Sequence, residues 1–133
     1  AEPGTAACEE ALTAIAHLGP AGFQPCIVPQ VLYEYWVVCT RPQAQNGLGI
    51  STAQASNDIE RLAELFFLLR DERAIFDLWC GLVDSHRVAG KNAHDARLVA
   101  AMLRHQVAHL LTFNAADFAR FGSIAVFTPS QLS

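Results

Sequence analysis

The segment His109-Leu-Leu-Thr-Phe-Asn-Ala-Ala-Asp-Phe118 decides the fold class of this chain. Its first part, residues 109–113, is a short apolar run of the kind that forms a buried strand. Asn114 and Asp117 then predict an N-cap and N3 pair on a short helical turn. A helix predicted at residues 93–104 precedes the run, and a strand predicted at residues 124–127 follows it. Strands separated by helices are typical of an α/β fold with a parallel sheet.

The first half of the chain alternates in the same way. Pro29 predicts the start of a helix, and Pro42 follows its predicted end. Ser51 and Gln54 have the spacing of a capping box, and Asp71 predicts the cap of a later helix. We therefore expect a helix at residues 5–18, a strand at 25–28, and helices at 29–40, from 51 through 66, and from 71 to about 86.

Size and composition narrow the class of protein. The chain has 133 residues, of which 52% are hydrophobic and 17% charged, so we expect one globular domain rather than a disordered segment. The net charge of −4 argues against a protein that wraps nucleic acid, but a nuclease needs only a few local phosphate contacts. No apolar run is long enough to span a bilayer, and we expect a cytoplasmic location.

The four cysteines predict no zinc or redox site. They are Cys8, Cys26, Cys39 and Cys80, and none belongs to a Cys-x-x-Cys pair. Their neighbours in the sequence are apolar. We therefore expect buried free thiols in a reducing compartment.

Three acidic residues stand where a carboxylate is locally unusual. Glu34 interrupts the apolar run of residues 31–39, Asp95 opens the helix after Gly90-Lys91, and Asp117 follows the strand at 109–113. Ligands of parallel sheets bind beyond the carboxyl ends of the strands, which would bring these acids together. Carboxylates that converge repel one another, so such a cluster usually holds a divalent cation. The pattern points to metal-dependent phosphate chemistry.

Each acid also has an ordinary structural reading. Glu34 is also explained as a glutamate on the protein surface, or as one paired to an arginine such as Arg97. Asp95 is also explained as a first-turn acid that compensates the helix dipole, and Asp117 as a residue that caps a local turn. Thr112 and Asn114 either orient a metal-bound water or a carboxylate, or simply cap. The dipeptide His94-Asp95 also suggests a His-Asp phosphohydrolase with His94 as a ligand, but those folds are all-helical and the predicted strands weigh against them.

Four stretches form an ordered set along the chain: Pro29-Gln-Val-Leu-Tyr-Glu-Tyr-Trp36, Gly90-Lys-Asn-Ala-His-Asp-Ala-Arg-Leu-Val99, Leu111-Thr-Phe-Asn-Ala-Ala-Asp-Phe118 and Ile124-Ala-Val-Phe-Thr-Pro129. Together they resemble the PIN domain, and more narrowly the VapC-type toxins of bacterial toxin–antitoxin pairs. The resemblance covers essentially the whole chain. It implies a single PIN-like domain over residues 1–133, an α/β three-layer sandwich with a parallel sheet flanked by helices.

The resemblance also implies a function. It is that of a Mg²⁺- or Mn²⁺-dependent endoribonuclease toxin that hydrolyses RNA phosphodiester bonds and is neutralised by a cognate VapB-type antitoxin. Glu34, Asp95 and Asp117 match the metal-site positions of the family, and Asn114 and Thr112 match the polar positions beside the last acid. Lys91 and Arg41 are the expected RNA contacts. The family typically forms homodimers. An alternative is a catalytically impaired PIN-like module that binds RNA or protein.

One departure from the family pattern concerns the start of the chain. PIN domains open with a central strand that ends in an aspartate, and this segment is not found before Ala1. A longer protein, a strand supplied by another polypeptide, or a naturally truncated member would each account for it. We expect a chain that starts at Ala1 to lack one carboxylate of the site and the middle strand of the sheet.

Overall fold

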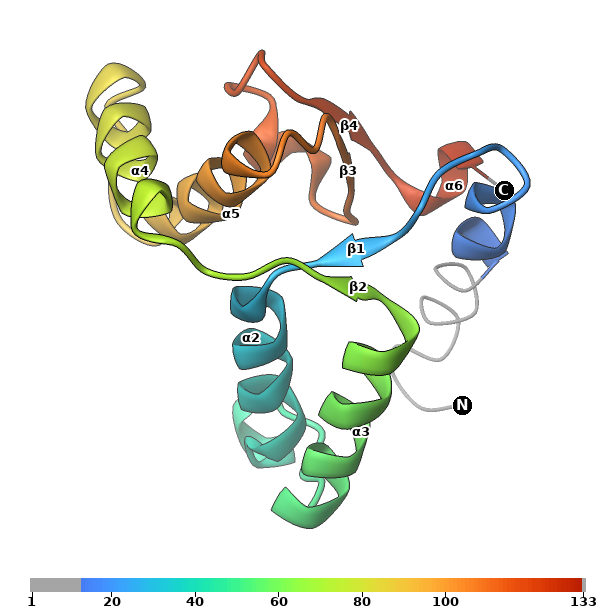
Figure 1. Cartoon of the computed structure of the whole chain (residues 1–133). Coiled ribbons are helices and arrows are strands. Elements are labelled where there is room, and N and C mark those ends of the chain that lie inside the picture. The colour runs from blue at the N-terminus through green and yellow to red at the C-terminus, as the bar shows by residue number, and fades with distance from the viewer. Residues whose placement is uncertain (1–12, 133) are drawn as a thin grey trace. The chain divides into compact units, whose positions relative to one another are not determined.

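The computed structural model describes residues 13–132, which form two compact units (Figure 1). Unit 1 comprises residues 13–25 and 72–132 of this range, and unit 2 comprises Cys26–Asp71. The elements of unit 2 are β1 (Cys26–Ile27), α2 (Pro29–Thr40), the 3-10 helix η1 (Gln43–Gln45), α3 (Thr52–Leu65) and β2 (Phe67–Leu68). Those of unit 1 are α4 (Arg73–Ser85), α5 (Asn92–Arg104), β3 (His109–Leu111), the 3-10 helix η2 (Ala115–Phe118), β4 (Ala125–Phe127) and α6 (Pro129–Leu132), and residues 13–18 are also helical.

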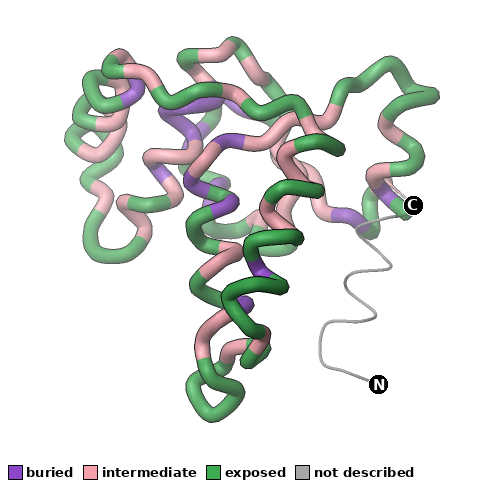
Figure 2. The backbone as a smooth tube through the Cα atoms, turned by 60° about the horizontal axis from the view of Figure 1, so that its bottom comes forward, coloured by how far each residue is buried: buried purple, intermediate pink, exposed green. Residues whose placement is uncertain are grey.

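Unit 1 is built around α5, which carries its most buried residues. The core cluster combines Ala96, Val99 and Met102 of α5 with Phe118, Phe121 and Ile124 (purple in Figure 2). Helix α4 lies beside α5 and packs Trp79, Leu82 and Val83 against this cluster. Burial of these apolar side chains is the main force that holds α4, α5 and η2 together.

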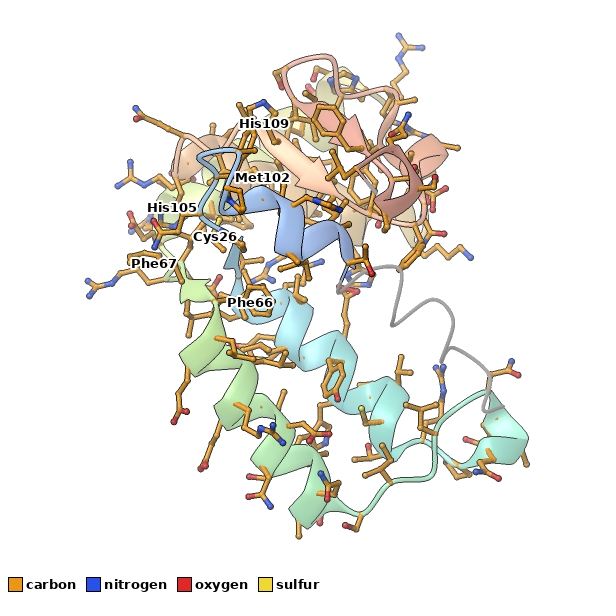
Figure 3. All side chains as sticks on the ribbon, turned by 90° about the vertical axis from the view of Figure 1, so that its right-hand side faces the viewer. Cys26, Phe66, Phe67, Met102, His105 and His109 are labelled. Carbon is orange, nitrogen blue, oxygen red and sulfur yellow. The ribbon has the colours of Figure 1, made fainter. Side chains whose placement is uncertain are left out.

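A short parallel sheet completes unit 1. Strand β3 pairs with β4 in the register His109↔Ala125 and Leu111↔Phe127. The ladder continues past β3, because the Thr112 N–H donates to the Phe127 carbonyl over 2.9 Å. The ring of His109, labelled in Figure 3, stacks on Phe127 with 5.8 Å between centroids and meets Phe23 edge-on at 5.1 Å.

Unit 2 is a pair of helices, α2 and α3, with a two-stranded parallel sheet. Strand β1 pairs with β2 in the register Cys26↔Phe67 and Ile27↔Leu68. The predicted capping box is half formed: the Ser51 hydroxyl accepts from the Gln54 N–H over 3.1 Å. The Gln54 side chain instead donates to Oδ1 of Asp58, at 2.9 Å.

The structure confirms the α/β class at a coarse level, with helices and short parallel strands. The strands predicted at 25–28, 109–113 and 124–127 and the helices predicted at 29–40 and 93–104 are present within one or two residues at each end. The predicted cap at Thr5 and most of the first helix lie outside the described residues. Within residues 13–132, the strands form two separate two-stranded sheets.

Three local predictions are wrong. Strand β2 was not predicted, since the helix was expected to include Phe66. The N-cap position of α4 is Glu72 rather than Asp71, and no side chain caps it, because the Glu72 carboxylate binds Arg104 instead. Asn114 occupies the N-cap position of η2, but its side chain makes no capping bond.

The thiols differ from one another in their burial. Cys39 is buried as expected, Cys26 is half-buried, and Cys80 is exposed, which corrects the prediction for that residue. Cys8 lies outside the described residues. Burial raises the pKa of the Cys26 thiol, which keeps it protonated and poorly nucleophilic at neutral pH. Among the helices within residues 13–132, none is both long and apolar enough to cross a membrane.

Candidate acidic site

Asp95 lies in the first turn of α5, on a well-anchored segment. Gly90 has φ +66°, a left-handed conformation that glycine adopts without strain, and it turns the chain into the helix. The indole Nε1 of Trp79 on α4 donates to the Ala93 carbonyl over 2.8 Å. Asp95 is half-buried, and the next residue, Ala96, is fully buried in the core cluster. The turn that carries Asp95 is therefore fixed on both sides.

Asp117 is held by the same core. It lies on η2 and is exposed, but the following residue, Phe118, is only 5% exposed and belongs to the cluster that contains Ala96. Asp95 and Asp117 thus each directly precede a residue of one apolar cluster. Within unit 1, α5 and η2 are in contact, so the two aspartates come from adjoining elements.

Thr112 and Asn114 form the turn between β3 and η2. Thr112 is half-buried at the carboxyl end of the strand, and its hydroxyl Oγ1 accepts from the Asn114 N–H over 3.1 Å. The Asn114 carbonyl accepts from the Asp117 N–H over 3.0 Å. The two polar residues therefore shape the backbone that leads to Asp117, and the Asp117 N–H that the Asn114 side chain was expected to cap is bound by the Asn114 carbonyl instead.

Glu34 belongs to unit 2, on the exposed face of α2. Its Oε1 accepts from the Gln30 Nε2 over 3.2 Å, and Gln30 is only 7% exposed. Glu34 is therefore a surface glutamate, as the structural alternative predicted. Its convergence with the aspartates of unit 1 stays a prediction. Gln30 was not predicted as a partner of Glu34, although the spacing of four residues is the helical distance at which such a pair meets.

The two residues predicted to contact RNA differ in exposure and hydrogen bonding. Lys91 is exposed just before α5, one turn from Asp95. Arg41 is half-buried at the end of α2, where its Nη2 donates to the Asn46 carbonyl over 2.9 Å. Its Nε is buried and has no hydrogen-bond partner among the described residues. Arg41 therefore braces its own loop, whereas Lys91 presents its charge to solvent; RNA contact by either residue stays a prediction.

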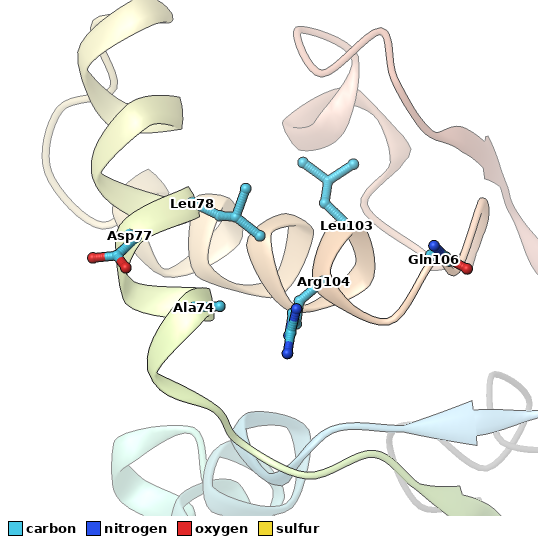
Figure 4. Close-up of a pocket in the computed structure, with 6 residues that line it drawn as sticks. All are labelled: Ala74, Asp77, Leu78, Leu103, Arg104 and Gln106. Atoms are coloured by element: carbon cyan, nitrogen blue, oxygen red, sulfur yellow. The ribbon is translucent and has the colours of Figure 1, made fainter.

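Unit 1 also has a shallow cavity of about 520 Å³ between α4 and the end of α5 (Figure 4). It contains none of the predicted site residues. Arg104 is already bound to Glu72, with 2.6 Å between Nη2 and Oε2, and Figure 4 shows Asp77 and Gln106 at opposite sides of the cavity. The lining residues are Ala74, Asp77, Leu78, Leu103, Arg104 and Gln106. These polar groups do not converge on one ligand.

Within residues 13–132, no three His, Cys, Asp or Glu side chains gather as a group that could hold a metal ion. His94, the ligand expected of a His-Asp phosphohydrolase, is exposed in the first turn of α5, and the strands β3 and β4 do not fit that all-helical fold. No protein-family model matches the chain, and no curated protein matches it significantly.

Proposed function

We propose that this chain is a metal-dependent endoribonuclease of PIN-like, three-layer architecture. The observation that carries the proposal is the placement of Asp95 and Asp117 on adjoining elements, each next to a residue of one core cluster. Carboxylates held so near one rigid core are positioned by the fold rather than by flexible loops, as a reactive site requires.

The donor groups suit a hard divalent cation. Asp117 is exposed, and its carboxylate makes no hydrogen bond or ion pair within residues 13–132, so it is available to a ligand. Asp95 is half-buried on α5, which contacts η2, and both side chains offer only oxygen. Oxygen ligands favour Mg²⁺ or Mn²⁺ over zinc. We propose Asp95, Asp117 and Glu34 as the residues that hold the ion.

The roles of the remaining residues follow from their positions. A bound Mg²⁺ or Mn²⁺ would activate a water and neutralise charge on the leaving oxygen of the phosphodiester. Thr112 and Asn114 keep the turn before Asp117 in place. Lys91, exposed one turn from Asp95, supplies positive charge for an RNA phosphate, and Arg41 is a second proposed contact. A VapB-type antitoxin and a second copy of the chain are the proposed protein partners.

The test is cleavage of a mixed RNA substrate by the purified chain in Mn²⁺. EDTA should abolish cleavage, and Asp95→Asn should lower the rate by at least about 100-fold, because it removes charge at the reacting centre. Asp77→Asn is the matched control. Asp77 is an exposed aspartate on α4, so this variant should cleave RNA like the wild type. A folded chain that binds RNA without cleaving it would instead indicate the impaired binding module.

A further inference from the structure

Two exposed arginines of unit 1, Arg87 and Arg120, lie outside the predicted site residues. Arg87 follows the end of α4, and Arg120 follows η2 by two residues. Among residues 13–132, neither guanidinium makes a hydrogen bond or an ion pair, whereas Arg104 binds Glu72. Arg87 and Arg120 therefore carry positive charge that pairs with none of the described carboxylates.

One core cluster anchors the backbone beside both arginines. The ring of His86 meets that of Phe121 edge-on, with 5.1 Å between centroids. Phe121 is 2% exposed and belongs to the core cluster, and Val88 packs against the same cluster. Arg87 thus lies between two anchored residues, and Arg120 directly precedes a third. The fold holds both backbones in place and leaves the long side chains able to reach a ligand.

The backbone at Arg87 is one at which an arginine is unfavourable. Its φ is +50°, in the left-handed region. Arg87 closes the end of α4, because the Arg87 N–H donates to the Asp84 carbonyl over 3.3 Å and the Val88 N–H donates to the Val83 carbonyl over 3.0 Å. Glycine is the usual residue at this position of a helix end, and a side chain there costs about 1–2 kcal/mol. A strained arginine without a protein partner points to a ligand outside the chain.

The sequence around the two arginines contains little negative charge. The connection from α4 to α5, residues 86–91, has no acidic residue, and the chain has none after Asp117. Arg87 lies in the connection that leads to Asp95, and Arg120 follows Asp117 by three residues. Positive charge therefore flanks each of the two aspartates. Carboxylates repel the phosphates of an approaching RNA, and nearby cations offset that repulsion.

We propose that Arg87 and Arg120 bind phosphates of the RNA backbone and so hold the strand beside Asp95 and Asp117. Their assignment to RNA rests on the proposed nuclease function, whose substrate they would hold. A guanidinium presents several N–H donors in one plane and binds a phosphate through two of them. Because a phosphate recurs in every nucleotide, such contacts position the strand without reading its sequence.

The test measures how the whole chain binds a fluorescently labelled single-stranded RNA, by anisotropy, in EDTA so that no metal-dependent cleavage occurs. Arg87→Gly and Arg120→Gln should each weaken binding at least about fivefold, and each should reduce the slope of log affinity against log salt by about 0.7. Glycine suits the left-handed backbone, so Arg87→Gly should fold at least as stably as the wild type. Arg87→Lys keeps the charge and should retain most of the affinity.

Arg73→Gln is the matched control. Arg73 is exposed at the first residue of α4, about 18 Å along the helix from its last residue, so this variant should bind RNA as the wild type does. An equal loss in Arg73→Gln would overturn the proposal, because total charge rather than position would then set the affinity.

Cleavage with Mn²⁺, measured beside binding, separates this proposal from the proposed function. Metal-dependent cleavage by a chain whose RNA affinity and salt slope are unchanged in Arg87→Gly and Arg120→Gln would overturn the role of the arginines and leave the nuclease standing. RNA binding that needs both arginines, in a chain that never cleaves RNA with Mn²⁺, would support their role as phosphate contacts and overturn the nuclease. A chain that binds no RNA would overturn both.

Discussion

The phenol of Tyr35 on α2 donates a hydrogen bond to Oδ2 of Asp58 on α3, over 3.0 Å. Gln54 donates to the other oxygen of the same carboxylate. Because each of its oxygens accepts a hydrogen bond, the Asp58 carboxylate links α2 and α3 at one fixed position along the two helices. Burial raises the pKa of Tyr35, and its hydrogen bonds with Cys39 and Asp58 raise it further.

This relationship predicts how stability depends on pH. The folded state holds the Tyr35 proton more tightly than the unfolded state, whose tyrosine ionises near its usual value of 10.0. The contribution of Tyr35 is therefore complete below about pH 10 and is lost as the pH rises above it. At neutral pH, Tyr35→Phe should lower the unfolding free energy by about 0.5–1.5 kcal/mol. Between pH 9 and 11, urea unfolding should show that the variant loses less stability with rising pH than the wild type does.

Tyr33→Phe is the control for that experiment. The Tyr33 phenol is 60% exposed on the same helix, so this variant should keep the wild-type slope. Equal slopes in wild type and Tyr35→Phe would show that the Tyr35–Asp58 bond does not link protonation to folding.

Two glycines should respond in opposite directions to alanine. A Cβ at Gly47 would lie 1.9 Å from the Arg41 carbonyl oxygen, so the loop must shift, and we expect a loss of about 1–3 kcal/mol in unfolding free energy. Gly81 lies within α4 with nothing within 4 Å of its Cβ position. Gly81→Ala should stabilise by about 0.5–1 kcal/mol. Thermal unfolding of the two variants tests the contrast, which equal shifts would contradict.

The core cluster of unit 1 should be far more sensitive than its surface. Phe118→Ala empties a site that is 5% exposed and should cost about 3–5 kcal/mol. Phe76→Ala, on the exposed side of α4, should cost less than about 1 kcal/mol. Chemical denaturation measures both. A small effect of Phe118→Ala would mean that the residue beside Asp117 does not anchor it.

The ion pair between Arg104 and Glu72 should contribute little despite its short distances. The Arg104 side chain is 46% exposed, so solvent screens the pair. We expect Arg104→Ala to cost less than about 1 kcal/mol, and 1 M salt to erase most of the difference from wild type. A large, salt-independent loss would indicate that the guanidinium acts mainly by packing.

Much of the fold could be predicted because local signals and tertiary contacts agree. The proline at the start of α2, the serine cap of α3 and the apolar spacing of α5 act within one turn of chain. Strand β2 could not be predicted from such signals, since Phe66 continues the helical spacing of Leu62 and only pairing with β1 makes the next residues extended. Likewise, the contact of Glu72 with a residue 32 positions away is invisible locally.

The candidate site shows the same division. The first-turn position of Asp95 and the turn position of Asp117 follow from the sequence, and the structure adds the shared core behind them. The exposure of Cys80 was missed because its apolar neighbours were considered without their helical phase, which turns Trp79 inward and Cys80 outward. The buried donor Gln30 was missed because glutamine is usually exposed.

Binding of Mn²⁺ to the purified chain decides whether Glu34, Asp95 and Asp117 act together on one cation. Titration calorimetry should show that Asp95→Asn, Asp117→Asn and Glu34→Gln each weaken binding by at least about tenfold, whereas Asp77→Asn leaves it unchanged. Affinities that are equal in all four variants and the wild type would contradict a shared cation site, and an effect of the two aspartates without Glu34 would confine the site to unit 1.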